Sequence, residues 1–148
     1  MKRVNVLGNG ESARIFTRGT DGLLLVCNMP PIDLPPEEVF ASCMVDFKMM
    51  KALHEGRVKL DQYDWVLGTR PRKWMEQTPA FYLKYSVNIK GFHVFVPPYA
   101  QLPGHSLSDA ATNYSCGHMA TDYACRIMKA DEVHMYGFDA MFDILSGI

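Results

Sequence analysis

Runs of consecutive apolar residues recur along the chain, and stretches with helical spacing of apolar residues separate them. Strand-length runs occupy residues 3–7, 23–27, 39–45, 65–68, 92–96 and 132–136, although the run at 39–45 leaves a helix open. Continuous rather than alternating runs are typical of strands covered on both faces, as in a parallel sheet. Helices are predicted at 12–18, at 47–54, at 72–87 with a break at Pro79, and within 109–129, where the strongest part begins near Gly117.

Strands that alternate with helices in this way indicate an α/β fold. The sequence therefore predicts one domain over residues 1–148, a Rossmann-like three-layer sandwich with a mainly parallel sheet of about six strands. Two proline-rich stretches, residues 29–36 and 96–104, follow strands and are predicted to be loops, because proline restricts itself and its predecessor. Both loops are expected at the carboxyl edge of the sheet, where α/β proteins bind ligands.

Composition excludes several classes of protein. A net charge of -1 argues against a nucleic-acid partner, which normally requires a basic face, and against an anionic membrane surface. No apolar run approaches the roughly 18 residues that a membrane span needs. The four cysteines form no CxxC pair, and no cluster of ligand residues has the spacing of a metal site. We therefore expect reduced thiols in a cytoplasmic protein without a bound metal.

The first predicted strand leads into a glycine loop, Gly8-Asn9-Gly10-Glu11-Ser12. Glycines at a strand-to-helix turn let backbone amides approach a ligand, and a helix start favours an anion. Ser12 is suited to cap that helix, whereas Glu11 adds negative charge to the loop. The alternative interpretation is a tight turn with Asn9 in the left-handed region.

Small polar residues also follow later strands. Asn28, Asp46 and Thr69 each stand at or just after a strand end, where an Asn side chain can read a base or sugar hydroxyl by donating and accepting together. Turn formation explains each of them equally well on its own. The most specific feature comes later: Ser115-Cys116-Gly117-His118 opens a helix, and the strand after that helix ends in Gly137-Phe138-Asp139.

These motifs, in this order, resemble those of the bacterial sialyltransferases of glycosyltransferase family 42 and of the related Maf-type motility accessory and pterin pyrophosphokinase-like proteins. The resemblance covers nearly the whole chain. It implies that Asn9 contacts a CMP-sugar donor, that Asn28 reads the nucleotide, and that Ser115 and Gly117 face the donor sugar or phosphate. Glu11 replaces the usual proline, Cys116 replaces the usual serine, and Ala140 to Phe142 stand where the family places aromatic residues including tyrosine.

The expected ligand set is therefore a small-molecule nucleotide or nucleotide sugar, with no further cofactor required. The residues expected to bind it are Gly8, Asn9, Gly10, Ser12, Asn28, Asp46, Thr69, Ser115, Gly117 and Asp139. The family's general base and lid lie further along than this sequence extends. His105 and His118 are the histidines expected near the site, and a histidine side chain titrates near neutral pH.

The resulting hypothesis is an inverting, sialyltransferase-like glycosyltransferase, with enzyme activity left open. One alternative is a nucleotide-sugar-binding module without catalysis. Another is a diphosphokinase-like transferase, and only this one would require Mg²⁺, held through water by Asp139, Asp143 and Glu11. A homo-oligomer is also expected, because a domain of this apolar content without the family's C-terminal part would leave apolar surface uncovered.

Overall fold

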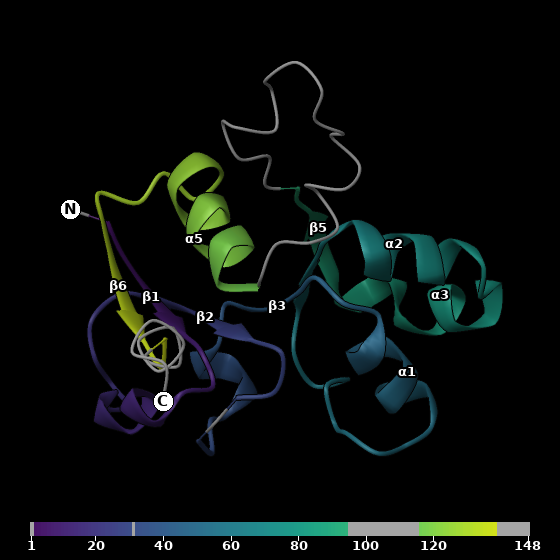
Figure 1. The fold of residues 1–148 in the computed structure, drawn as a ribbon, viewed down its shortest axis with the longest axis horizontal. Helices are drawn as coiled ribbons and strands as arrows, with labels where there is room; N and C mark the ends of the chain where they lie inside the picture. The colour runs from purple at the N-terminus through teal and green to yellow at the C-terminus, as the bar shows by residue number, and fades with distance from the viewer. Residues whose placement is uncertain (1, 31, 95–115, 139–148) are drawn as a thin grey trace, which may run out of the picture.

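A computed structural model describes residues 2–30, 32–94 and 116–138 of the chain. Its strands form one sheet in the order β5-β4-β3-β2-β1-β6, and every neighbouring pair is parallel (Figure 1). The strands are β1 (Arg3–Leu7), β2 (Leu23–Cys27), β3 (Ala41–Met44), β4 (Trp65–Leu67), β5 (Ile89–Phe92) and β6 (Glu132–Tyr136). The predicted α/β class, with a parallel six-stranded sheet between helices, is confirmed.

Helices cover both faces of this sheet. One face carries η1 (Glu11–Ile15), η2 (Pro36–Glu38), α1 (Lys48–His54), α2 (Thr69–Glu76), α3 (Pro79–Tyr85) and η3 (Ser86–Asn88), and the other carries α5 (Cys116–Arg126) (Figure 1). Successive strand residues point to opposite faces, so Val6 belongs to the core on the side of α5 whereas Leu7 belongs to the core on the side of η1, α1 and α2. Each face therefore has its own apolar core. Among the described residues, no helix combines the length and the apolar character of a membrane span.

The order of the strands creates one reversal. Strands β1 to β5 follow one another across the sheet, and the chain then crosses the opposite face through α5 and returns to place β6 beside β1. In open α/β sheets, ligands bind outside the carboxyl ends of the strands near such a reversal. The loops that follow β1 and β6 therefore mark the first place to look for a site.

Helix α2 and helix α3 together replace the long helix predicted at 72–87. The predicted break is confirmed, since α2 ends at Glu76 and α3 begins at Pro79, whose fixed φ and missing amide suit the first position of a helix. The start of the helix was predicted three residues too late, since α2 begins at Thr69, directly after Gly68.

Two other local predictions are wrong. The strand predicted at 92–96 is β5 at Ile89–Phe92: it is an edge strand whose burial alternates, so its apolar residues are not continuous. Residues 95 and 96, and the loop predicted at 96–104, lie outside the described residues. The predicted helix at 12–18 is only the five-residue 3-10 helix η1, with Phe16 already extended. Ser12 does not cap it: its Oγ accepts a hydrogen bond from the Gly137 amide at 2.9 Å.

Candidate functional site

The glycine loop after β1 packs directly against the loop after β6. The Gly8 amide donates to the Tyr136 carbonyl at 2.7 Å, and the Gly10 amide donates to the Gly137 carbonyl at 2.8 Å. A Cβ on Gly8 would lie 2.7 Å from the Gly137 oxygen, and Gly137 itself has a φ of 82°. Gly8 and Gly137 therefore allow the two loop backbones to approach each other. The amides of Gly8 and Gly10 are hydrogen-bonded to the loop after β6.

The side chain of Phe138 joins this contact to the start of α5. Its ring lies against Gly8 and Gly117, and a Cβ on Gly117 would overlap the ring. Gly8 and Gly117 are both buried. The structure thus brings together two motifs that are far apart in the sequence, the first glycine loop and the glycine of the later helix.

Two of the predicted asparagines, Asn9 and Asn28, lie near the end of β2, next to the glycine loop. Asn9 is exposed, and its Nδ2 donates to the Cys27 carbonyl at 3.1 Å. Asn28 has a φ of 62°, its amide donates to the Cys43 carbonyl at 3.0 Å, and its carbonyl accepts from Ser42 Oγ at 2.7 Å. The left-handed asparagine of this region is therefore Asn28 rather than Asn9. The contact of Asn9 uses one of its two side-chain N–H groups.

A cluster of buried thiols lies beneath these residues. Cys27 and Cys43 are paired across β2 and β3, and Cys116 Sγ donates to the Cys43 carbonyl at 2.7 Å. A hydrogen bond with the Cys27 side chain, together with burial, raises the pKa of Cys116 well above its ordinary value, and burial raises that of Cys43. Cys43 and Cys116 are therefore kept as neutral thiols, and the hydrogen bond of Cys116 fixes the first turn of α5 on the sheet.

Asp46 and Thr69 lie further along the same edge, after β3 and β4. Asp46 Oδ1 accepts from the Lys48 amide at 3.2 Å, which supports the start of α1. Thr69 opens α2 and lines a cavity of about 240 Å³. Arg72 and Lys73 also line that cavity, and the Arg72 guanidinium lies 5.0 Å from the Phe92 ring centre. Glu76 lines the cavity as well, with its Oε1 3.4 Å from Arg72 Nε, so Lys73 is the lining cation that pairs with no carboxylate among the described residues.

The remaining predicted residues divide into two sets. His118 is exposed on the first turn of α5, directly after Gly117. His105, Ser115 and Asp139 lie outside the described residues. Of the predicted binding residues, the structure gathers Gly8, Asn9, Gly10, Ser12, Asn28 and Gly117 around the ends of β1, β2 and β6 and the start of α5.

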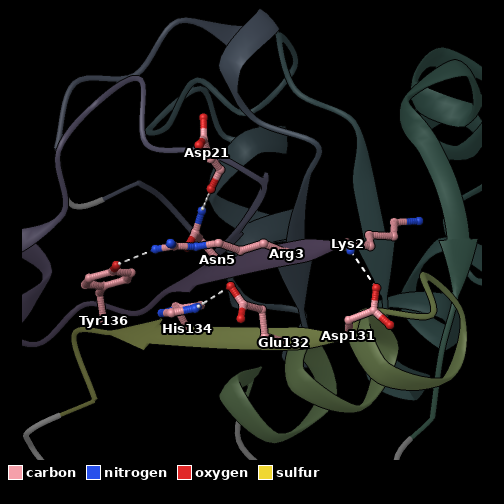
Figure 2. A network of polar contacts seen from close by, with 8 residues as sticks. All are labelled: Lys2, Arg3, Asn5, Asp21, Asp131, Glu132, His134 and Tyr136. Carbon is pink, nitrogen blue, oxygen red and sulfur yellow. Dashed lines mark hydrogen bonds and ion pairs between the residues drawn. The ribbon is translucent and has the colours of Figure 1, made fainter.

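Two polar features were not anticipated from the sequence. Figure 2 shows the first, in which Arg3 reaches across the sheet from buried Asn5 to Tyr136, with hydrogen bonds of 3.1 Å to Asn5 Oδ1 and 3.2 Å to Tyr136 Oη. Asn5 Nδ2 also donates to the Asp21 carbonyl at 3.0 Å, so this buried amide is paired. The second is the contact of His93 with Asp122, 29 residues apart in the sequence, a separation that no local pattern reveals.

A larger cavity lies away from the predicted site. It measures about 500 Å³ and is lined by residues near the starts of β2 and β3, among them Thr20, Leu24 and Glu38. None of the predicted binding residues contributes to it. We take the carboxyl edge rather than this cavity as the candidate site, because polar groups gather there and sheets of this topology bind ligands at that edge.

Comparison of the chain with protein-family models, with curated proteins and with solved structures gives no match. Within residues 2–30, 32–94 and 116–138, no group of His, Cys, Asp or Glu side chains is arranged to hold a metal ion. What the fold and the site define is therefore a Rossmann-like α/β protein with asparagine side chains at the carboxyl edge of its sheet.

Proposed function

We propose that this protein binds a nucleotide or nucleotide sugar at the carboxyl edge of β1 and β2, beside the start of α5. The observation that carries the proposal is the hydrogen bond of Asn9 Nδ2 to the carbonyl of Cys27, which places Asn9 of the glycine loop beside the end of β2, where Asn28 follows Cys27. Asparagine side chains donate and accept together, which matches the edges of a base and the hydroxyls of a ribose. The site also lies beside the reversal of strand order.

The finer proposal is that the ligand is a CMP-sugar and that the protein is a sialyltransferase-like transferase. It rests on the sequence resemblance. In an inverting transfer, a base removes the proton of an acceptor hydroxyl while hydrogen-bond donors stabilise the departing phosphate. At the same edge of the sheet, Lys73 is a cation suited to a phosphate, and Arg72 is a second one once its pair with Glu76 opens. The cytoplasmic setting and the homo-oligomer remain predictions.

Ligand binding is tested first, by thermal unfolding with CMP, CDP, UDP, GDP, AMP and their sugar derivatives. A ligand at 100 times its Kd stabilises the native state by about 2.7 kcal/mol. In a domain of this size that corresponds to a rise in Tm of roughly 5–11 °C. No rise with any member of the panel would contradict the proposal.

Side-chain variants then locate the site by calorimetry. Asn9→Ala and Asn28→Gly are expected to raise the Kd of the bound nucleotide while the fold stays intact, and glycine suits the positive φ of Asn28. Asn88→Ala is the matched control, because Asn88 Nδ2 donates to the Asp61 and Tyr63 carbonyls elsewhere in the fold. It should lower the Tm without changing the Kd. If Asn9→Ala lowers only the Tm, Asn9 is a turn residue and the proposed site is wrong.

The alternatives separate in the same experiments. A binding module without catalysis would bind the nucleotide sugar and release no free nucleotide. A diphosphokinase-like transferase would need added Mg²⁺ for turnover.

A further inference from the structure

A further cavity lies between α1 and α3, at the end of the molecule away from β1 and β6 (Figure 1). It measures about 490 Å³, a volume in the range of pockets that hold one small molecule. Its lining comes from the end of α1, from the segment 56–61 that leads toward β4, and from α3. None of the predicted binding residues that the structure describes lines it. This cavity, the α1–α3 groove, is therefore separate from the site at the carboxyl edge.

Three aromatic side chains, His54, Phe81 and Tyr85, line the α1–α3 groove. Phe81 is buried, and its ring contacts the Trp74 ring edge to face with centroids 4.9 Å apart and the Tyr85 ring at 4.6 Å. The His54 ring, exposed at the end of α1, meets Phe81 edge to face at 5.9 Å. Packing thus holds these rings in place before any ligand arrives, which lowers the free-energy cost of binding. Aromatic surfaces of this kind suit a planar ring.

Two lysines, Lys59 and Lys84, line the same groove, and both are exposed. Among the residues that the structure describes, no carboxylate forms an ion pair with either of them. Lys84 Nζ lies 5.1 Å from the centre of the Tyr85 ring, so a cation stands beside an aromatic side chain of the groove. Asp61 is the one carboxylate among the described lining residues. The lining therefore has an excess of positive charge next to its rings.

The surrounding end of the molecule is positive as well. Residues 47–88 contain eight Lys and Arg side chains and four Asp and Glu side chains, a net charge of +4, whereas the net charge of the whole chain is -1. This segment includes α1, α2 and α3, which lie together in Figure 1. A positive surface of this kind attracts anions and raises their rate of association. The near-neutral charge of the chain therefore conceals a basic end.

The larger cavity near the starts of β2 and β3 has no such excess. Its two cations, Arg18 and Lys90, pair with Glu38 and Asp64 at 2.8 and 3.4 Å. Glu37 also lines it, so carboxylates outnumber cations among its described lining residues. An anion is therefore expected in the α1–α3 groove and not in the larger cavity.

We propose that the α1–α3 groove is a second binding site, for a small aromatic phosphate. The planar ring of the ligand packs against His54 and Tyr85, and the ammonium groups of Lys59 and Lys84 hold its phosphate. A phosphate carries close to two negative charges at neutral pH, which matches two lysines. The proposal is independent of the function proposed above. A ligand that bridges α1 and α3 binds only the native state and therefore stabilises it.

Calorimetry with 1-naphthyl phosphate tests the site, and 1-naphthol and inorganic phosphate represent the two halves of this probe. We expect naphthyl phosphate to bind in a saturable way and each half to bind more weakly. Naphthol that binds as tightly as naphthyl phosphate would contradict the role of the lysines. Inorganic phosphate that binds as tightly would contradict the role of the rings.

Variants of the exposed side chains locate the site without disturbing the core. Lys59→Gln and Lys84→Gln should each raise the Kd of naphthyl phosphate by about 2–5-fold, as for exposed ion pairs. The double variant should raise it by about 4–25-fold if the two lysines act independently. His54→Ala should raise it by about 2–13-fold through the loss of a ring contact. Lys51→Gln is the matched control, because Lys51 is exposed on α1 at the same basic end and does not line the groove, so the Kd should change by less than about twofold.

A nucleotide is itself an aromatic phosphate, so the same variants separate this site from the one at the carboxyl edge. A rise in Tm with a nucleotide that the double lysine variant loses and Asn9→Ala keeps would support the groove and contradict the site at β1 and β2. If naphthyl phosphate does not bind, or if the double variant binds it with the Kd of the wild type, the groove is not a site for aromatic phosphates. The same holds if Lys51→Gln weakens binding as much as Lys59→Gln and Lys84→Gln do. Each of these last outcomes leaves the proposed nucleotide site standing.

Discussion

The contact between Gly8 and Gly137 gives the sharpest prediction about the architecture of the site. Gly137→Ala places a methyl group 2.6 Å from the Gly8 carbonyl oxygen, a backbone atom that cannot rotate away. It also imposes a side chain on a φ of 82°. The left-handed conformation costs about 1–2 kcal/mol for a residue with a Cβ. The overlap adds about 1–3 kcal/mol, as is usual when atoms are forced into a packed region.

Gly56→Ala separates these two effects. Gly56 has a φ of 76°, and a Cβ there would meet nothing within 4 Å. It stands two residues after the end of α1, with its own amide bonded to the Leu53 carbonyl and the Arg57 amide bonded to the Ala52 carbonyl. This arrangement favours glycine after a helix. Its substitution by alanine should therefore carry only the conformational cost of about 1–2 kcal/mol.

Urea unfolding followed by circular dichroism measures the difference. We expect Gly137→Ala to be less stable than Gly56→Ala by about 1–3 kcal/mol. In a domain of this size, that difference corresponds to roughly 2–12 °C in Tm. Equal destabilisation of the two variants would show that the loops after β1 and β6 do not approach as closely as the structure has them. The close contact beneath the proposed site would then be wrong.

Three further predictions concern the thiols and the surface. In the native protein, the exposed Cys125 should react with a thiol reagent well before the buried cysteines. The pKa of Cys43 and of Cys116 is raised well above 9.0, so near that pH these two thiols ionise in the unfolded chain but not in the native one. Their contribution to the free energy of unfolding should therefore be constant below about pH 9 and fall above it. Cys43→Ala should flatten this fall, and an unchanged slope would contradict the assignment. A homo-oligomer is also predicted, and Leu83 and Val87 are exposed apolar residues that it could cover, at 77% and 86%. A monomeric mass in light scattering would refute it.

Sequence alone determined the class of fold, because strands buried on both faces must be apolar at nearly every position. The runs at 3–7 and 23–27 therefore matched β1 and β2 without any shift. The run at 132–136 matched β6 as well, although β6 is an edge strand without a fully buried residue. Pro79 fixed the break between α2 and α3 through its own backbone chemistry. The same rule misplaced β5, because an edge strand needs apolar residues at alternate positions only.

Tertiary structure decided how the candidate site is assembled. The glycine loop was visible in the sequence, but only the placement of β6 beside β1 showed that the amides of Gly8 and Gly10 bond to the chain itself. The hydrogen bond of Ser12 with Gly137 spans 125 residues, and that of His93 with Asp122 spans 29. Local patterns carry no information about such pairs, because they depend on the register of strands and the direction of a helix that crosses the sheet.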